Sequence, residues 1–134
     1  MLRNKLLWYC RMKVKLRKSP NPKKKFRATF EDGTSVDFGA KGYSDFTIHK
    51  TPLRMRSYLI RHGAGPYLSP GILREKRGKV VLNRLVNLSN SHLENWKMSG
   101  VKTAGFWSRW LLWSIPSMEG AKKLMTKKFN IKFI

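Results

Sequence analysis

Few residues in this sequence could do acid–base or metal chemistry. The 134-residue chain holds three histidines, seven carboxylates and one cysteine. Asp45, His49 and His62 are the one set that could be imagined as a metal or acid–base site, and Cys10 lies far from them along the chain. A lone histidine near a helix end is far more often a cap or a core residue than a ligand. We therefore expect no metal site, no cofactor and no catalytic residue.

The signatures of common catalytic sites are also missing. The sequence has no phosphate-binding Walker loop, no Gly-x-Ser-x-Gly motif and no glycosidase-like pair of carboxylates in apolar surroundings. Four of the seven carboxylates fall between residues 31 and 45. We therefore expect a protein that is not an enzyme and takes no small-molecule substrate.

The basic residues are a stronger indication of function. Lys and Arg number 29 against seven Asp and Glu, a formal net charge of +22. Residues 1–25, 26–49, 50–88 and 89–134 carry +10, −2, +8 and +6, so one acidic island lies within a basic chain. Such an excess of basic residues indicates a partner that is nucleic acid, an anionic membrane surface or an acidic protein.

Two basic clusters with neighbouring aromatic residues could contact such a partner. One follows Trp8 and Tyr9, and the other follows Tyr67. Cations interleaved with aromatic rings bind nucleic acid without sequence preference, and no sequence-specific reader motif is present. The residues expected to contact the partner or polyanion are Arg11, Lys13, Lys15, Arg17, Lys23, Lys24, Lys25, Arg74, Lys76, Arg77 and Lys79.

A third candidate is the aromatic segment at residues 103–114, whose large side chains follow helical spacing. This ridge is either a core helix, with Arg109 paired to a carboxylate of the acidic island, or a protein interface, or a membrane-interface helix. The core interpretation is favoured. The ridge residues are Phe106, Trp107, Trp110 and Trp113.

The elements that must position these residues begin with strict alternation over residues 8–17. Apolar side chains from Trp8 to Leu16 alternate with cationic ones up to Arg17, which predicts a strand with one apolar and one basic face. Residues 18–25 hold two prolines and four lysines, which favours an extended linker. We therefore expect residues 1–25 to form an extended basic N-terminal arm.

A β-hairpin is expected over residues 26–38. A three-residue loop with Gly33 in the left-handed conformation pairs Phe26 with Phe38 and gathers the apolar residues on one face. A two-residue Asp-Gly turn would instead place apolar residues opposite polar ones. The three-residue loop is therefore predicted.

Four helices are expected after the hairpin. Each has a capping residue at its start, and glycines end the first and second. Residues 79–88 are ambiguous between strand and helix. The expected boundaries are Thr51 to Gly63, Ser91 to Gly100, a start at Thr103, and a last helix of about residues 118–129.

These patterns predict an α+β fold in which a small β-hairpin or sheet is packed by three to four short helices, with the extended basic N-terminal arm. Residues 26–134 form one domain that includes a basic loop excursion at about 63–91. Cys10 is expected in the core of a protein from a reducing compartment. No apolar run approaches the roughly 20 residues that cross a bilayer, and no secretory signal is recognised.

Several segments together resemble a known family. They are Asp37-Phe-Gly-Ala-Lys-Gly-Tyr-Ser-Asp-Phe-Thr-Ile-His49, Arg61-His62, Asn95-Trp96, Thr103 to Trp113 and Pro116-Ser117. The chain is similar, over roughly residues 24–62 and 94–129, to a family of small basic proteins of nucleocytoplasmic large DNA viruses that infect algae and amoebae. It departs from that pattern in the excursion and in the basic arm.

The resemblance implies a viral setting. It leads us to expect a structural component of a large DNA virus particle, namely a minor capsid or inner virion protein that cements capsid subunits or links the shell to the inner membrane. The alternative is a nonspecific DNA-binding or genome-condensing virion protein. The expected partners are capsid proteins of the same virus, the anionic inner membrane surface or genomic DNA, and the expected locations are the inner side of the capsid and the host cytoplasmic assembly site.

Overall fold

The computed structural model describes residues 11–74 and 84–134 and shows one four-stranded sheet with several short helices. The predicted α+β fold is thereby confirmed. The strands are β1 (Met12–Lys18), β2 (Lys24–Phe30), β3 (Ser35–Ala40) and β4 (Ile131–Phe133). The α-helices are α2 (Phe46–His49), α3 (Pro52–Leu59), α4 (Pro70–Arg74), α6 (Ala104–Trp107) and α7 (Met118–Phe129).

The strand order β3-β2-β1-β4 places β1 inside the sheet. This strand pairs antiparallel with β2, with Leu16 opposite Ala28, and parallel with β4, with Met12 beside Ile131. The predicted strand therefore exists, but the prediction of a separate arm is wrong for residues 12–25, which belong to the domain. The apolar side chains of β1 explain why, since Val14 is fully buried against the core.

The hairpin has the predicted register. Phe26 lies opposite Phe38 and Ala28 opposite Val36. Gly33 has φ +86°, and the amide of Phe30 donates to the carbonyl of Thr34 at 2.9 Å. The left-handed conformation that glycine adopts readily is therefore what closes the three-residue loop.

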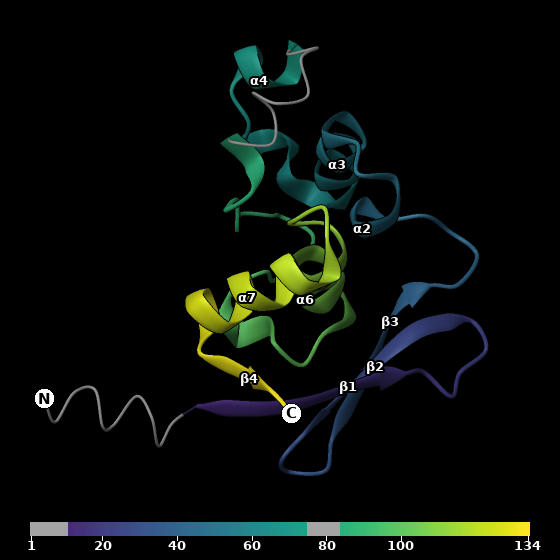
Figure 1. The fold of residues 1–134 in the computed structure, drawn as a ribbon. Coiled ribbons are helices and arrows are strands. Elements are labelled where there is room, and N and C mark those ends of the chain that lie inside the picture. The colour runs from purple at the N-terminus through teal and green to yellow at the C-terminus, as the bar shows by residue number, and fades with distance from the viewer. Residues whose placement is uncertain (1–10, 75–83) are drawn as a thin grey trace, which may run out of the picture.

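The α-helices of the described residues all lie on one side of the sheet, so within residues 11–74 and 84–134 no helix covers its other face (Figure 1). The core fills the space between the covered face and the helices, with Phe38, Trp107 and Trp110 fully buried. Within the described ranges no helix is long and apolar enough to cross a membrane.

Three of the four predicted helices form. Thr51 precedes α3 and Gly63, at φ +102°, ends the π-helical turn that continues it over Ile60–Ala64. The hydroxyl of Thr103 accepts from the amide of Phe106, and that of Ser117 accepts from the amide of Gly120. A second π-helical turn, Ser108–Leu112, continues α6.

The helix predicted between Ser91 and Gly100 is not formed. Ser91 does accept a hydrogen bond from the amide of Glu94 at 3.0 Å, as a capping residue would. The Glu94 carboxylate, however, binds the Trp96 indole instead of returning to the Ser91 backbone, and only a 3-10 turn, Met98–Gly100, follows. Residues 79–83 of the ambiguous segment lie outside the described residues, as does Cys10.

Candidate anion-binding surfaces

The uncovered face of the sheet displays the basic side chains of β1. Lys13, Lys15 and Arg17 are exposed and alternate with Val14, which points into the core. The parallel register places Lys132 of β4 beside Lys13, so two like charges are neighbours across the strands. Because such pairs are unfavourable on their own, the arrangement indicates a surface suited to a negatively charged partner.

One ion pair crosses this open face. Arg27 of β2 lies between Arg17 and Asp37 in the register and forms a bidentate pair with Asp37, at 2.7 and 2.9 Å. The hydrogen bonds from Arg27 lower the pKa of Asp37. Asp37 is the one carboxylate on the outward positions of the described strands, and Arg27 already neutralises it. The open face, defined by Lys13, Lys15, Arg17, Arg27 and Lys132, is therefore strongly cationic.

The acidic island predicted from the sequence is largely neutralised within the molecule. Asp32 pairs with Lys102, Asp37 with Arg27, and Asp45 with Lys25 at 2.6 Å. Hydrogen bonds from Lys102 and Thr34 lower the pKa of Asp32. The island therefore does not form an acidic surface of its own.

The three lysines at the start of β2 differ in their surroundings. Lys23 is exposed in the turn, and Lys24 is half-buried at the edge of a pocket. The side chains of Lys25 and Asp45 are only 14% and 3% exposed, and Asp45 also caps α2 by accepting from the amide of Thr47. Lys25 is thus part of a buried ion pair, and its prediction as a partner contact is corrected.

The remaining predicted basic contacts are dispersed. Arg11 lines a shallow groove beside α7 together with Lys122, Lys127 and Lys132. Arg74 is exposed at the end of α4. The predicted contacts Lys76, Arg77 and Lys79 lie outside the described residues.

The aromatic ridge belongs to the core. Phe106, Trp107 and Trp110 have no exposed surface, and Trp107 contacts Phe38 on the covered face of the sheet at 5.7 Å between ring centroids. Trp113 alone is half-buried. The interface and membrane alternatives are therefore wrong for the first three residues, which fill the space between sheet and helices.

Arg109 is fully buried without a carboxylate, contrary to the predicted ion pair. Its guanidinium donates to the backbone carbonyls of Leu85, Val86, Leu88 and Trp113 at 2.7 to 3.2 Å. It also lies over the Trp110 ring, 4.5 Å from the centroid. Burial lowers the pKa of Arg109 to about 9, so the side chain is still protonated at neutral pH. Arg109 therefore joins the segment after residue 84 to the aromatic helix.

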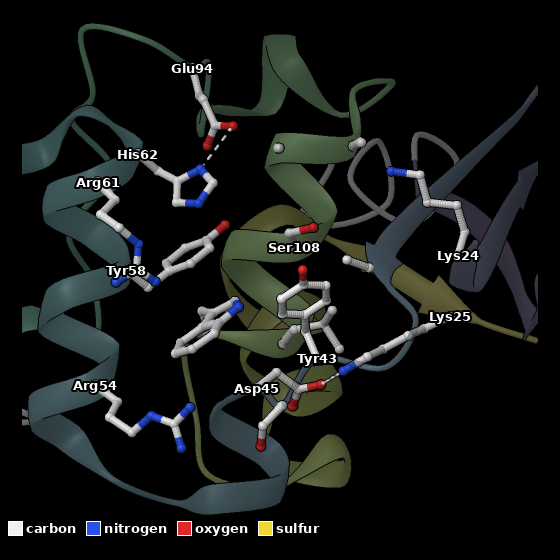
Figure 2. A pocket seen from close by; sticks show the side chains of 17 residues that line it. Lys24, Lys25, Tyr43, Asp45, Arg54, Tyr58, Arg61, His62, Glu94 and Ser108 are labelled. Carbon is white, nitrogen blue, oxygen red and sulfur yellow. Dashed lines mark hydrogen bonds and ion pairs between the residues drawn. The ribbon is translucent and has the colours of Figure 1, made fainter.

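A pocket of about 350 Å³ opens between the end of the hairpin, α3 and α6 (Figure 2). Its walls carry the side chains of Lys24, Arg54 and Arg61, for which no ion pair or hydrogen bond is found within the described ranges. Tyr43, 74% exposed, lies at its edge. The pocket was not predicted, because its cations are separated by up to 37 positions in the sequence.

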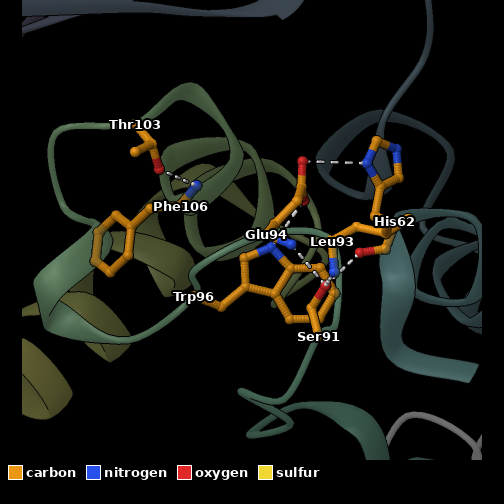
Figure 3. Close-up of polar contacts among 7 residues, drawn as sticks. All are labelled: His62, Ser91, Leu93, Glu94, Trp96, Thr103 and Phe106. Atoms are coloured by element: carbon orange, nitrogen blue, oxygen red, sulfur yellow. Dashed lines mark hydrogen bonds and ion pairs between the residues drawn. The ribbon is translucent and has the colours of Figure 1, made fainter. Parts of the chain in front are cut away.

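Both carboxylates in the pocket wall are already bound by other groups. Asp45 pairs with Lys25. Glu94 accepts from the indole of Trp96 at 2.9 Å and lies 3.4 Å from Nδ1 of His62 (Figure 3). Burial opposes the ionisation of Glu94, but the hydrogen bonds from His62 and Trp96 bring its pKa below the ordinary value. Four Lys and Arg against two carboxylates leave the pocket with a net charge of +2.

Tyr58 forms the back of this pocket. Its ring stacks on Trp113 at 4.4 Å and 4°, and on His62 at 4.1 Å. Its hydroxyl oxygen is buried and has no hydrogen-bond partner among the described residues. Burial raises the pKa of Tyr58, so the hydroxyl remains a neutral donor.

The structure does not bring Asp45, His49 and His62 together as one group of ligands. Among the described residues no group of three potential ligands lies together. Asp45 forms an ion pair with Lys25, and Nδ1 of His49 accepts a hydrogen bond from the amide of Thr51 at 3.0 Å. Burial lowers the pKa of His49, which favours its neutral form.

Comparison with protein families matches residues 14–62 to a family of unknown function, DUF5754. The match spans about a third of the chain and contains most of the first three strands, α2 and α3. Comparisons with curated proteins and with solved structures found no match. The matched segment includes the basic residues Lys24, Arg54 and Arg61 of the pocket.

Proposed function

We propose that this protein is a non-enzymatic structural component of a large DNA virus particle, acting as a minor capsid or inner virion protein. The cationic open face is the observation that supports it. A sheet surface that no described helix covers offers five basic side chains and one neutralised carboxylate to a partner. The viral setting rests on the resemblance of the sequence to small basic proteins of such viruses.

The proposed partner of the open face is an acidic surface of a capsid subunit. Charge complementarity across such an interface fixes orientation and speeds association more than it adds affinity. The aromatic core is buried, and the ion pairs of Asp32, Asp37 and Asp45 neutralise most of the acidic island, so this face keeps a net positive charge. A protein with such a face would cement subunits or link the shell to the anionic inner membrane.

Cross-linking mass spectrometry on purified particles tests this proposal. A carbodiimide, which activates carboxylates so that a lysine amine forms an amide with them, should cross-link Lys13, Lys15 and Lys132 to acidic segments of capsid proteins. The cementing role is wrong if nuclease and detergent together release the protein while the shell remains intact.

A second candidate function is nonspecific DNA binding within the particle. The neutralisation of the acidic island favours it, because no acidic surface around the hairpin would repel phosphates. If the five cations of the open face contact phosphates, log Kd should change with log salt with a slope of up to about 4.5, at roughly 0.9 per phosphate.

The decisive variant replaces Lys13, Lys15 and Arg17 by Gln. Its matched control replaces the exposed Lys41, Arg84 and Lys97, which removes the same charge elsewhere. Weaker binding to duplex DNA and a reduced salt slope in the first variant alone would support DNA binding through the open face. Negligible binding of the unmodified protein at physiological salt would exclude the DNA candidate.

A further inference from the structure

We propose that the pocket between the hairpin, α3 and α6 binds the phosphate group of a small ligand, either free phosphate or a phosphate monoester. This site is distinct from the open face, because none of the open-face residues lines the pocket. It goes beyond the proposed docking function.

Three cations from separate elements reach the same pocket. Lys24 comes from β2, Arg54 from α3, and Arg61 from the π-helical turn that follows α3. Figure 2 shows the Arg54 guanidinium and the Lys24 ammonium on opposite sides of the pocket. Like charges gathered without carboxylate partners are costly unless an anion joins them, and phosphate is the anion that arginine binds with the best geometry.

The carboxylates in the wall do not supply that anion. Asp45 is held by Lys25 and by the amide of Thr47, and Glu94 is held by Trp96 and His62. An incoming phosphate would therefore meet the cations without first breaking an internal ion pair.

Tyr58 provides a second, independent indication. A buried hydroxyl without a partner costs roughly 1 to 3 kcal/mol, and such groups are rare in folded proteins. The ring is fixed between Trp113 and His62, so the hydroxyl cannot turn away to solvent. A phosphate oxygen in the pocket would accept a hydrogen bond from this hydroxyl, and the half-buried Ser108 lines the same wall as a further donor.

The size of the pocket admits more than a phosphate ion. A volume of about 350 Å³ falls at the lower end of the range for small-molecule sites. The exposed Tyr43 ring at the edge offers an aromatic surface on which a base could stack. Free phosphate and a nucleoside monophosphate are therefore both worth testing as sources of the phosphate group.

Isothermal titration calorimetry with sodium phosphate and, separately, with AMP tests the site on the full chain. We expect at least one to bind, and Arg54→Gln or Arg61→Gln to weaken that binding about tenfold, as expected for one charge-assisted hydrogen bond. Tighter binding of AMP than of phosphate, reversed by Tyr43→Ala, would identify the monoester as the source. Absence of binding by both probes would overturn the proposal.

The matched control for charge is Arg74→Gln, an exposed arginine outside the pocket. An equal loss of affinity in Arg74→Gln would show diffuse attraction and would contradict a defined site. The open-face variant Lys15→Gln with Arg17→Gln should leave phosphate binding unchanged. The two proposals can therefore fail separately.

Tyr58→Phe is the most selective variant because it removes only the unpaired hydroxyl. We expect an unchanged or higher Tm without ligand, together with a fall of about fivefold in affinity for the phosphate probe. Full affinity in Tyr58→Phe would show that the anion does not reach this wall, and the site as proposed would be wrong.

Discussion

The two faces of the sheet are built from the same strands yet differ in every physical respect. On the covered face Val14, Ala28 and Phe38 are fully buried beneath aromatic helices. On the open face Lys13, Lys15 and Arg17 project from the same β1 backbone and are exposed, with no described helix over them. The two faces therefore have different roles. Apolar burial on the covered face stabilises the fold, whereas the exposed charge of the open face can bind a partner.

Two basic residues, Lys25 and Arg109, are largely buried and have partners within the protein. Lys25 is stabilised by a carboxylate, Asp45, whereas Arg109 is stabilised by four backbone carbonyls and an aromatic ring. Neither is available to a partner. These two basic residues therefore belong to the fold, whereas the exposed basic residues of β1 do not.

The largest expected effect is on the covered face. Trp107→Ala should lower the free energy of unfolding by about 3 to 5 kcal/mol, because it leaves a cavity beside Phe30 and Phe38 and removes the indole donor to the carbonyl of Val101. Urea denaturation measures the change. Trp107→Phe keeps an aromatic ring and should cost clearly less; equal losses would mean that packing at this position is unimportant.

Arg109→Lys should cost about 3 kcal/mol. Lysine keeps the charge but offers three donors on one nitrogen instead of a planar fork, so several carbonyls between Leu85 and Leu88 lose their partner. Thermal denaturation of this variant beside Arg84→Lys, an exposed arginine in the same segment, measures the difference. Equal Tm values for the two variants would show that the carbonyl contacts contribute nothing.

Asp45→Asn should cost about 2 kcal/mol, less than for a fully enclosed pair because Lys25 keeps 14% exposure. The amide can still cap α2, so the loss reports on the ion pair. Lys25→Met as a single variant and the double variant complete a thermodynamic cycle. Additive losses in that cycle would show that the pair has no coupling energy.

A substitution on the open face should leave the free energy of unfolding almost unchanged. Replacing Lys15 by Gln should change the free energy of unfolding by no more than about 0.5 kcal/mol, because the side chain is exposed and has like-charged neighbours. Urea denaturation at low and high salt checks this. A loss above 1 kcal/mol would mean that the open face contributes to the fold, and the contrast between the faces would not hold.

The smallest expected effect is a pH dependence from His49. Burial holds its pKa below the ordinary value of about 6.5, and Nδ1 accepts from the amide of Thr51. The unfolded chain therefore takes up the proton first, so the free energy of unfolding should fall as the pH drops below about 6.5 and level off below the folded-state pKa. Urea denaturation between pH 7.5 and 5 should show a shallower fall in His49→Gln; an identical profile would contradict this assignment.

Local features were predictable from the sequence. The hairpin register follows from alternation and from Gly33, and Thr103 and Ser117 begin their helices as their residue types indicate. The core role of Trp107 follows from helical spacing of aromatic residues. In each case the residues that decide the structure lie within a few positions of one another.

The errors concern contacts that are distant in the sequence. The basic stretch before residue 26 was predicted as an arm because the prolines and lysines of residues 18–25 favour an extended linker. The structure instead pairs β1 with the nearby β2 and, at the other end of the sequence, with the three-residue strand β4. Arg109 was assigned a carboxylate because backbone carbonyls have no signature in a sequence. The pocket depends on the tertiary approach of Lys24 to α3, which no local pattern predicts.

The parallel pairing of β1 with β4 has a consequence during synthesis. At about 5 to 20 residues per second, β1 must wait roughly 6 to 24 seconds after its own translation before its second neighbour is made. Throughout that time one edge of β1 offers unpaired backbone groups beside the apolar Val14. Until β4 is made, the lysines and arginine of the open face would hinder the unpaired edge of β1 from pairing with other nascent chains, since charged edge strands resist aggregation.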